Sequence, residues 1–304
     1  MPNELLLRLS EFAPPEFMRQ AMLGLLLIAP LAALSGVQVV NSRMSFFSDA
    51  IGHSAFAGVA IGLIFSLPVD LSMAGLALAV GLIITYLRRG SRLSTDTVIG
   101  IIFSAVVAFG LAIVSRNREA SRNVNMFLNG DILTIDDREI ALLAIVLTIF
   151  LAFQFFAWNR MLHISVNEQI AVVHRIKAPV YQYLFSALLS LVVILCVRAV
   201  GVLLVTAVLI VPAATARNFA RNSRQLFFLS LLFSYAGCAG GLLISAQKWA
   251  KVPAGAAIVL LSCALFAVSF AAAHLRGNKA VFLRFPLRKR GGVQLICRLP
   301  RRKT

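Results

Sequence analysis

Asp49 and His53 form an acid–imidazole pair at the start of a long apolar stretch, residues 50–69. On a helix, residues four apart lie on one face, about one turn from each other. An ionisable group in a membrane segment is costly and marks a candidate functional site, and Asp with His suits a divalent transition metal. The pair alone leaves a second interpretation equally open, in which Asp49 begins a helix near the surface and His53 is a packed polar residue.

Small residues run beside this pair at four-residue intervals: Ala50, Ser54, Gly58 and Gly62. In membranes, such a stripe lets a second helix approach closely. We therefore expect one side of this helix to pack tightly while the neighbouring side offers ligands to an interior path. We also expect Ser48 to cap the N-terminus of the helix.

The composition predicts the elements that must position the pair. The 304 residues are 60% hydrophobic and 13% charged, with a mean hydropathy of +0.88, whereas a soluble domain is about 45–50% apolar and about 25% charged. Runs long enough to cross a membrane cover residues 17–40, 50–69, 71–87, 97–115, 139–158, 180–197, 199–213, 225–247 and 252–275. Because these runs are continuous rather than alternating, the sequence predicts an all-α, polytopic integral membrane protein with eight or nine transmembrane helices.

The count stays open because residues 180–197 and 199–213 are separated only at position 198, so they form either a hairpin or a bent, re-entrant element. If the first helix runs outside to inside and all nine cross, most of the 29 Lys and Arg face the cytoplasm, as the positive-inside rule requires. The predicted organisation is an extracytoplasmic segment 1–16, a transmembrane domain 17–275 and a basic cytoplasmic tail 276–304. This tail suits anionic lipid better than nucleic acid.

A second segment of interest follows position 200. Its apolar helix is expected to end at Pro212, after which an Ala-rich stretch leads to Arg217, Arg221 and Arg224. On the topology above these arginines are cytoplasmic. A short basic helix of this kind suits docking to a partner, and an ordinary positive-inside loop explains it equally well.

Several classes of chemistry have no matching motif in the sequence. It contains no G-x-x-x-x-G-K-[ST] phosphate-binding loop, so we do not expect the chain to hydrolyse ATP. It also lacks a nucleophile elbow, a zinc-protease helix and paired catalytic carboxylates. Its four cysteines have no metal-site or redox spacing. We therefore expect neither an enzyme nor a tightly bound cofactor.

The two segments resemble the membrane permease subunit of bacterial metal-ion ABC importers, the class that carries zinc, manganese or iron. The first match comprises residues 43–49, 53–54 and 58–59, and the second runs without a gap over residues 201–217. Weaker matches follow in family order at residues 96–101, 130–133 and 252–256. Together they span about residues 20–270.

The resemblance implies a multi-pass permease of the bacterial cytoplasmic (inner) membrane whose substrate is a divalent transition metal ion. Its partners would be a cytoplasmic ATP-binding subunit, an extracytoplasmic solute-binding protein and a second permease copy or paralogue. Asp49 and His53 would line the metal path. The segment that couples to the ATPase would comprise Pro212, Ala213, Ala214, Thr215, Ala216, Arg217 and Arg221.

Two departures from the family pattern bear on the cargo. Lys251 and Val252 stand where the family often has an acidic residue, and the helix with Phe103 lacks a histidine that is frequent in the zinc branch. The second departure slightly favours manganese or iron. The alternatives are a permease for a metal chelate, siderophore or corrinoid, and a stand-alone channel or secondary carrier.

Overall fold

The computed structural model describes residues 16–115, 135–245, 247 and 252–275, and these are predominantly helical. The predicted segment 1–16, apart from Glu16, and the predicted tail 276–304 lie outside the described residues. The helices are α2 (Glu16–Asn41), α3 (Phe47–Ile64), α4 (Val69–Gly90), α5 (Thr95–Val114), α7 (Asp137–Val166), α8 (Glu168–Val173), α9 (Ala178–Val200), α10 (Val202–Arg217), α11 (Ser223–Ser245) and α12 (Ala254–Leu275).

Eight of these helices are long and apolar enough to span a membrane, which confirms the predicted polytopic all-α fold. Their outer faces carry large apolar side chains, such as Phe155, which is 84% exposed. Apolar patches of this extent are unfavourable in water, so these faces are suited to contact with lipid. The core is also apolar and includes the buried rings of Phe150 and Phe185, whose centroids lie 6.5 Å apart.

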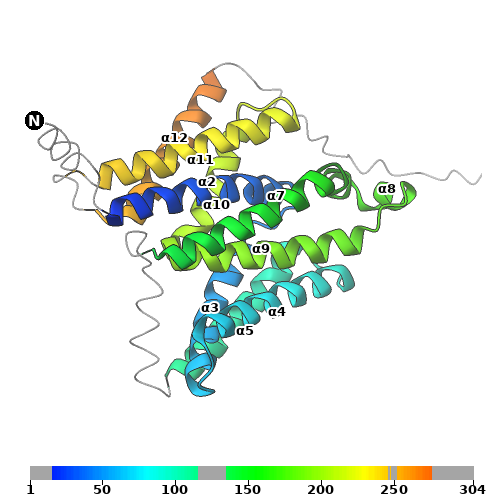
Figure 1. Cartoon of the computed structure of the whole chain (residues 1–304). Coiled ribbons are helices and arrows are strands. Elements are labelled where there is room, and N and C mark those ends of the chain that lie inside the picture. Colours follow the sequence, from blue (N-terminus) through cyan, green and yellow to red (C-terminus); the bar gives the residue numbers. More distant parts are fainter. Residues whose placement is uncertain (1–15, 116–134, 246, 248–251, 276–304) are drawn as a thin grey trace, which may run out of the picture.

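The stretch that left the helix count open forms two helices. Gly201 joins α9 to α10 with a φ of 94°, a backbone conformation that glycine adopts without steric cost. With 16 residues, α10 is about 24 Å long, shorter than the hydrocarbon layer of about 30 Å. It passes behind α2 in Figure 1 and contacts α2, α3, α9, α11 and α12. The described part of the chain therefore has eight helices that are long enough to span a membrane, with the shorter α10 at the centre of the bundle.

The expected end of this helix at Pro212 is wrong, since α10 continues through Pro212 to Arg217. Proline removes one backbone hydrogen bond, but neighbouring helices and Ser or Thr side chains compensate for this in membranes. Pro212 removes the donor to the carbonyl of Val208, four residues earlier, but it is buried in the bundle, where α2, α11 and α12 pack against α10.

Most of the other described helices form two groups around α10. In Figure 1, α2, α7, α9 and α11 run nearly parallel across the view, and α3, α4 and α5 form a second group beside α9. The contacts of α9 with α3 and α4 join the groups. This arrangement places α3, which carries the acid–imidazole pair, next to α10.

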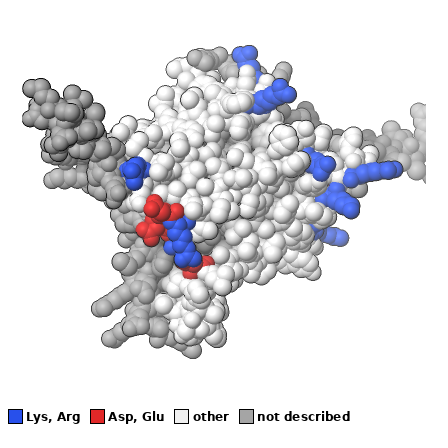
Figure 2. Space-filling view, in the orientation of Figure 1, with Lys and Arg blue, Asp and Glu red and all other residues white. Residues whose placement is uncertain are grey.

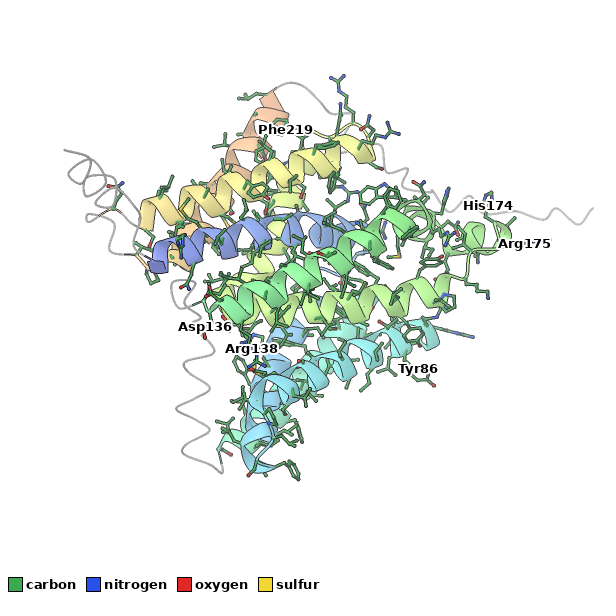
Figure 3. The ribbon with its side chains drawn as sticks, viewed as in Figure 1. Tyr86, Asp136, Arg138, His174, Arg175 and Phe219 are labelled. Atoms are coloured by element: carbon green, nitrogen blue, oxygen red, sulfur yellow. The ribbon has the colours of Figure 1, made fainter. Side chains whose placement is uncertain are left out.

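Charge separates the two ends of the bundle. In Figure 2, most of the basic side chains visible in this view lie toward the end where α8 links α7 to α9, and the visible acidic ones lie at the other end. Figure 3 shows His174 and Arg175 at the first end and Asp136 and Arg138 at the second. This distribution agrees with the orientation drawn from the positive-inside rule, with the α8 end in the cytoplasm.

Candidate metal passage

Helix α3 begins earlier than the apolar run indicated. The N–H of Ala50 donates to the carbonyl of Phe46 at 3.1 Å, so the first turn already includes Ser48 and Asp49. The expectation that Ser48 caps the helix is therefore wrong, because Phe46 occupies the cap position. Ser48 is buried, and its hydroxyl has no hydrogen-bond partner among the described residues.

The small-residue stripe of α3 packs against α4, as the sequence predicted. A Cβ atom added at Gly58 would lie 2.7 Å from the Cα of Met73, a distance that real Cβ contacts do not reach. The Ser72 hydroxyl also donates to the carbonyl of Gly58 at 2.7 Å. This close packing turns the adjoining face of α3, with Asp49 and His53, away from α4.

Asp49 and His53 are among the few α3 residues that are not fully buried. The Thr206 hydroxyl of α10 donates a hydrogen bond to Oδ1 of the Asp49 carboxylate. The His53 ring meets Phe56 of its own helix and Phe103 of α5 edge to face, each at a centroid distance of 5.2 Å. The structure thus brings the pair together with a hydroxyl and two aromatic rings.

Contacts on either side of Asp49 give its depth. Met44, five residues earlier, accepts a hydrogen bond through its sulfur from Arg88 at the cytoplasmic end of α4, at 3.0 Å. Gly52, three residues later, faces Val197 and Val202 near the extracytoplasmic junction of α9 and α10. Asp49 therefore lies between the two ends of the bundle, on a helix that is long and apolar enough to span a membrane.

The donors around this point do not form a complete metal cage. Among the residues that the structure describes, no three His, Cys, Asp or Glu side chains come together as ligands. A resident zinc ion usually has four ligands, whereas one carboxylate and one imidazole, with a nearby hydroxyl, give a weaker set. Such a set suits an ion that binds and leaves, not a structural or catalytic metal.

A half-buried stripe on α10 leads from this point toward the cytoplasm. Thr206, Ile210 and Ala214 are spaced four residues apart and are partly exposed, whereas most of the other described α10 side chains are buried. The stripe ends near Arg217, which is exposed. Helix α10 therefore presents one continuous face between the acid–imidazole pair and the cytoplasmic end.

The residues of the predicted coupling segment differ in how far they are buried. Four of its residues are buried in the bundle: Pro212, Ala213, Thr215 and Ala216. Ala213 and Ala216 pack with Val37 of α2 and Leu226 of α11. Only Arg217 and Arg221 are exposed, so within this segment a protein partner has access mainly to those two.

Sequence reasoning missed α8, which lies beyond the ends of α7 and α9 in Figure 1. Asn167 initiates it, since its side-chain oxygen accepts the N–H of Gln169 at 2.9 Å. Arg89 of α4 binds Glu168 at 2.8 Å and also donates to Gln182 of α9. The Asn-Glu sequence at 167–168 is a helix-start signal that would have found this element.

Comparison with known proteins identifies the family to which this bundle belongs. Residues 15–273 match the ABC 3 transport family. The chain belongs to this family. It is 30% identical over 254 residues to ZnuB, the membrane protein of a high-affinity zinc uptake system of Haemophilus influenzae, and the match covers 84% of this chain and 97% of that protein.

Two further relatives of the ABC 3 chain come from streptococci. The manganese import permease ScaB of Streptococcus gordonii is 31% identical over 84% of this chain and 90% of its own length. A chain of the solved structure of PsaBC from Streptococcus pneumoniae in complex with Fab is 30% identical in sequence to this chain. The two folds match with a TM-score of 0.72, over 89% of this chain and 95% of that chain. The ABC 3 chain is therefore a multi-pass membrane permease, a transport subunit and not a catalytic enzyme.

Proposed function

We propose that this chain is the permease subunit of an ABC importer that moves a divalent transition metal ion (zinc, manganese or iron) across the bacterial cytoplasmic membrane. The observation that carries the proposal is the position of Asp49 and His53, which are partly buried on a membrane-spanning helix, with Thr206 bonded to Asp49. Dehydrating a carboxylate there is costly, and a passing cation offsets that cost. The names of the relatives, which concern zinc uptake and manganese import, support the same class of cargo.

The surroundings of His53 favour a bare ion over a chelate. A chelate, siderophore or corrinoid needs a wide path with few ligands, whereas the rings of Phe56 and Phe103 crowd His53. Helix α5 presents a phenylalanine and not a histidine at this point, so the described donor groups are a carboxylate, a hydroxyl and one imidazole. Oxygen-rich sets suit manganese better than zinc.

ATP hydrolysis is assigned to a separate cytoplasmic subunit, since the sequence has no phosphate-binding loop. We assign its docking surface to α8 together with Arg217 and Arg221, which are exposed at the turn between α10 and α11. An extracytoplasmic solute-binding protein and a second permease copy or paralogue complete the proposed assembly. The second permease would also supply ligands that a single chain lacks.

Metal uptake by cells that express the complete transporter tests this proposal. Asp49→Asn and His53→Ala should each reduce manganese or zinc uptake to the level of cells without the protein, while the amount of protein in the membrane stays unchanged. Ser104→Ala is the matched control, because Ser104 is exposed on α5 and bonds only to its own helix. Normal uptake by both pair variants would remove the two residues from the path.

A further inference from the structure

A groove between α7 and α11 has no role in the passage described above. It encloses about 380 Å³, and its walls include Gln154, Phe155 and Trp158 of α7 with Phe227 and Phe228 of α11. Its floor includes Leu34 of α2. Trp158 and Phe227 meet edge to face across it, with ring centroids 6.0 Å apart.

The outer rim of this groove faces the lipid. Phe155 is 84% exposed and Phe228 is 65% exposed, and both lie on helices that span the membrane. The α7 residues that line it recur at positions 151, 154, 155 and 158, which is the spacing of a single helix face. This face is therefore expected to contact the acyl chains of the membrane.

The cytoplasmic end of the groove is basic and polar. Asn159 and Arg224 line it, and Arg224 also lines an adjoining hollow of about 480 Å³ with Arg221, Asn222 and Gln225. Arg224 is the second residue of α11, so it stands at the level of the cytoplasmic headgroups. Its guanidinium is exposed and forms no ion pair with any described residue, so it can pair with an anion.

Gln154 provides an independent sign that the groove holds a ligand. Its side chain is 5% exposed, and both Nε2 and Oε1 are buried without a hydrogen-bond partner in the described part of the chain. Leaving such a buried amide without hydrogen bonds is energetically costly. Gln154 lies one helical turn deeper in the membrane than Trp158. With a phosphate bound near Arg224, the Gln154 amide is at the depth of the lipid ester groups.

We propose that this groove is a binding site for an anionic phospholipid of the cytoplasmic leaflet. The phosphate pairs with Arg224, the glycerol region lies beside Trp158 and Phe228, and an ester carbonyl accepts a hydrogen bond from the Gln154 amide. An acyl chain then continues past Leu151. The charged and polar Arg224 and Asn159 lie at the cytoplasmic end of the groove and the apolar Leu151 lies at its deeper end, as the headgroup and the acyl chains of a phospholipid do. Basic pockets between helices on the cytoplasmic side are suited to such headgroups.

Quenching of Trp158 fluorescence by brominated acyl chains tests the proposal. The chain has two tryptophans, Trp158 and Trp249, so Trp249→Phe leaves one reporter in the groove. The full-length protein is placed in phosphatidylcholine vesicles that contain either brominated phosphatidylglycerol or brominated phosphatidylcholine at the same mole fraction. We expect phosphatidylglycerol to be preferred by about fivefold, the effect of one arginine near the surface.

Three variants in the Trp249→Phe background separate the contacts. Arg224→Gln should abolish the preference for phosphatidylglycerol, and Arg92→Gln, which changes an exposed cytoplasmic arginine outside the groove, should keep it. Gln154→Leu should weaken quenching by both lipids alike, because both carry the ester. Equal quenching by the two lipids, or equal behaviour of the two arginine variants, would overturn the site. Complete lack of quenching would mean that protein, such as a second copy, covers the groove instead.

Discussion

The Thr206 hydroxyl donates a hydrogen bond to the Asp49 carboxylate, although the two residues are 157 positions apart in the chain. The bond joins α10 to α3 at membrane depth and holds one carboxylate oxygen in place. Hydrogen bonds to charged groups contribute about 1.5–3 kcal/mol. Thr206 is therefore a positioning residue for the proposed metal path, acting through Asp49.

Removing this hydroxyl should weaken transport without abolishing it. Thr206→Val keeps the shape of the side chain but frees the carboxylate to rotate, so we expect the apparent affinity for metal to fall by about tenfold, as expected from the loss of a bond of this strength. Thr206→Ser keeps the hydroxyl and should restore most of the affinity. The measurement is the concentration dependence of metal uptake. Equal affinities for the Val and Ser variants would show that the hydroxyl has no positioning role.

Reversing the charge of Arg217 and Arg221 should uncouple the two halves of the transport cycle. Both side chains are exposed at the turn between α10 and α11, and glutamates there would repel a partner surface that binds arginines. In the reconstituted transporter we expect ATP hydrolysis to lose its stimulation by substrate while metal uptake stops. Arg138→Glu, the same charge reversal at the extracytoplasmic end (Figure 3), is the control and should leave coupling intact.

Adding one methyl group at Gly58 should destabilise the bundle. The new Cβ would lie 2.7 Å from the backbone of Met73, so Gly58→Ala must push α3 and α4 apart, at a cost of about 1–3 kcal/mol. Gly75→Ala is the matched control on α4, because a Cβ there meets no atom within 4 Å. Thermal unfolding in detergent checks this expectation: the midpoint should fall for Gly58→Ala and stay level or rise slightly for Gly75→Ala. Equal midpoints would mean that α3 and α4 do not pack this closely.

The ion pairs of Arg198 should stabilise the extracytoplasmic end. Its guanidinium binds Asp70 of α4 at 2.5 Å and Glu139 of α7 at 2.6 Å, and so ties three helices together beside the Gly201 junction. Asp70 is 51% exposed and Glu139 is 20% exposed, and water screens the more exposed pair more strongly. We expect Glu139→Gln to lower the unfolding midpoint more than Asp70→Asn does. The reverse order would show that exposure does not determine the strength of these two pairs.

The sequence predicted those parts of the site that depend on local spacing. Asp49 and His53 share a face because they are four residues apart, and Gly58 faces α4 because small residues recur at the same interval. The limits of the helices were less predictable, since neighbours decide them. Ser48 is inside the helix that it was expected to cap, because the helix begins one residue earlier, at Phe47. Pro212 continues the helix that it was expected to end, because packing of α10 against α2 and α11 outweighs the local preference.

The chain by itself determined that this is a polytopic helical membrane protein with an acid–imidazole pair in one span, because apolar length and helical period are properties of consecutive residues. Only the tertiary structure decided which groups of other helices lie opposite this pair. The pairing of Thr206 with Asp49, the contact of Phe103 with His53 and the groove that joins Gln154 to Arg224 each depend on helices that are distant in sequence. Their meeting is set by how whole helix faces pack, and no short-range pattern encodes it.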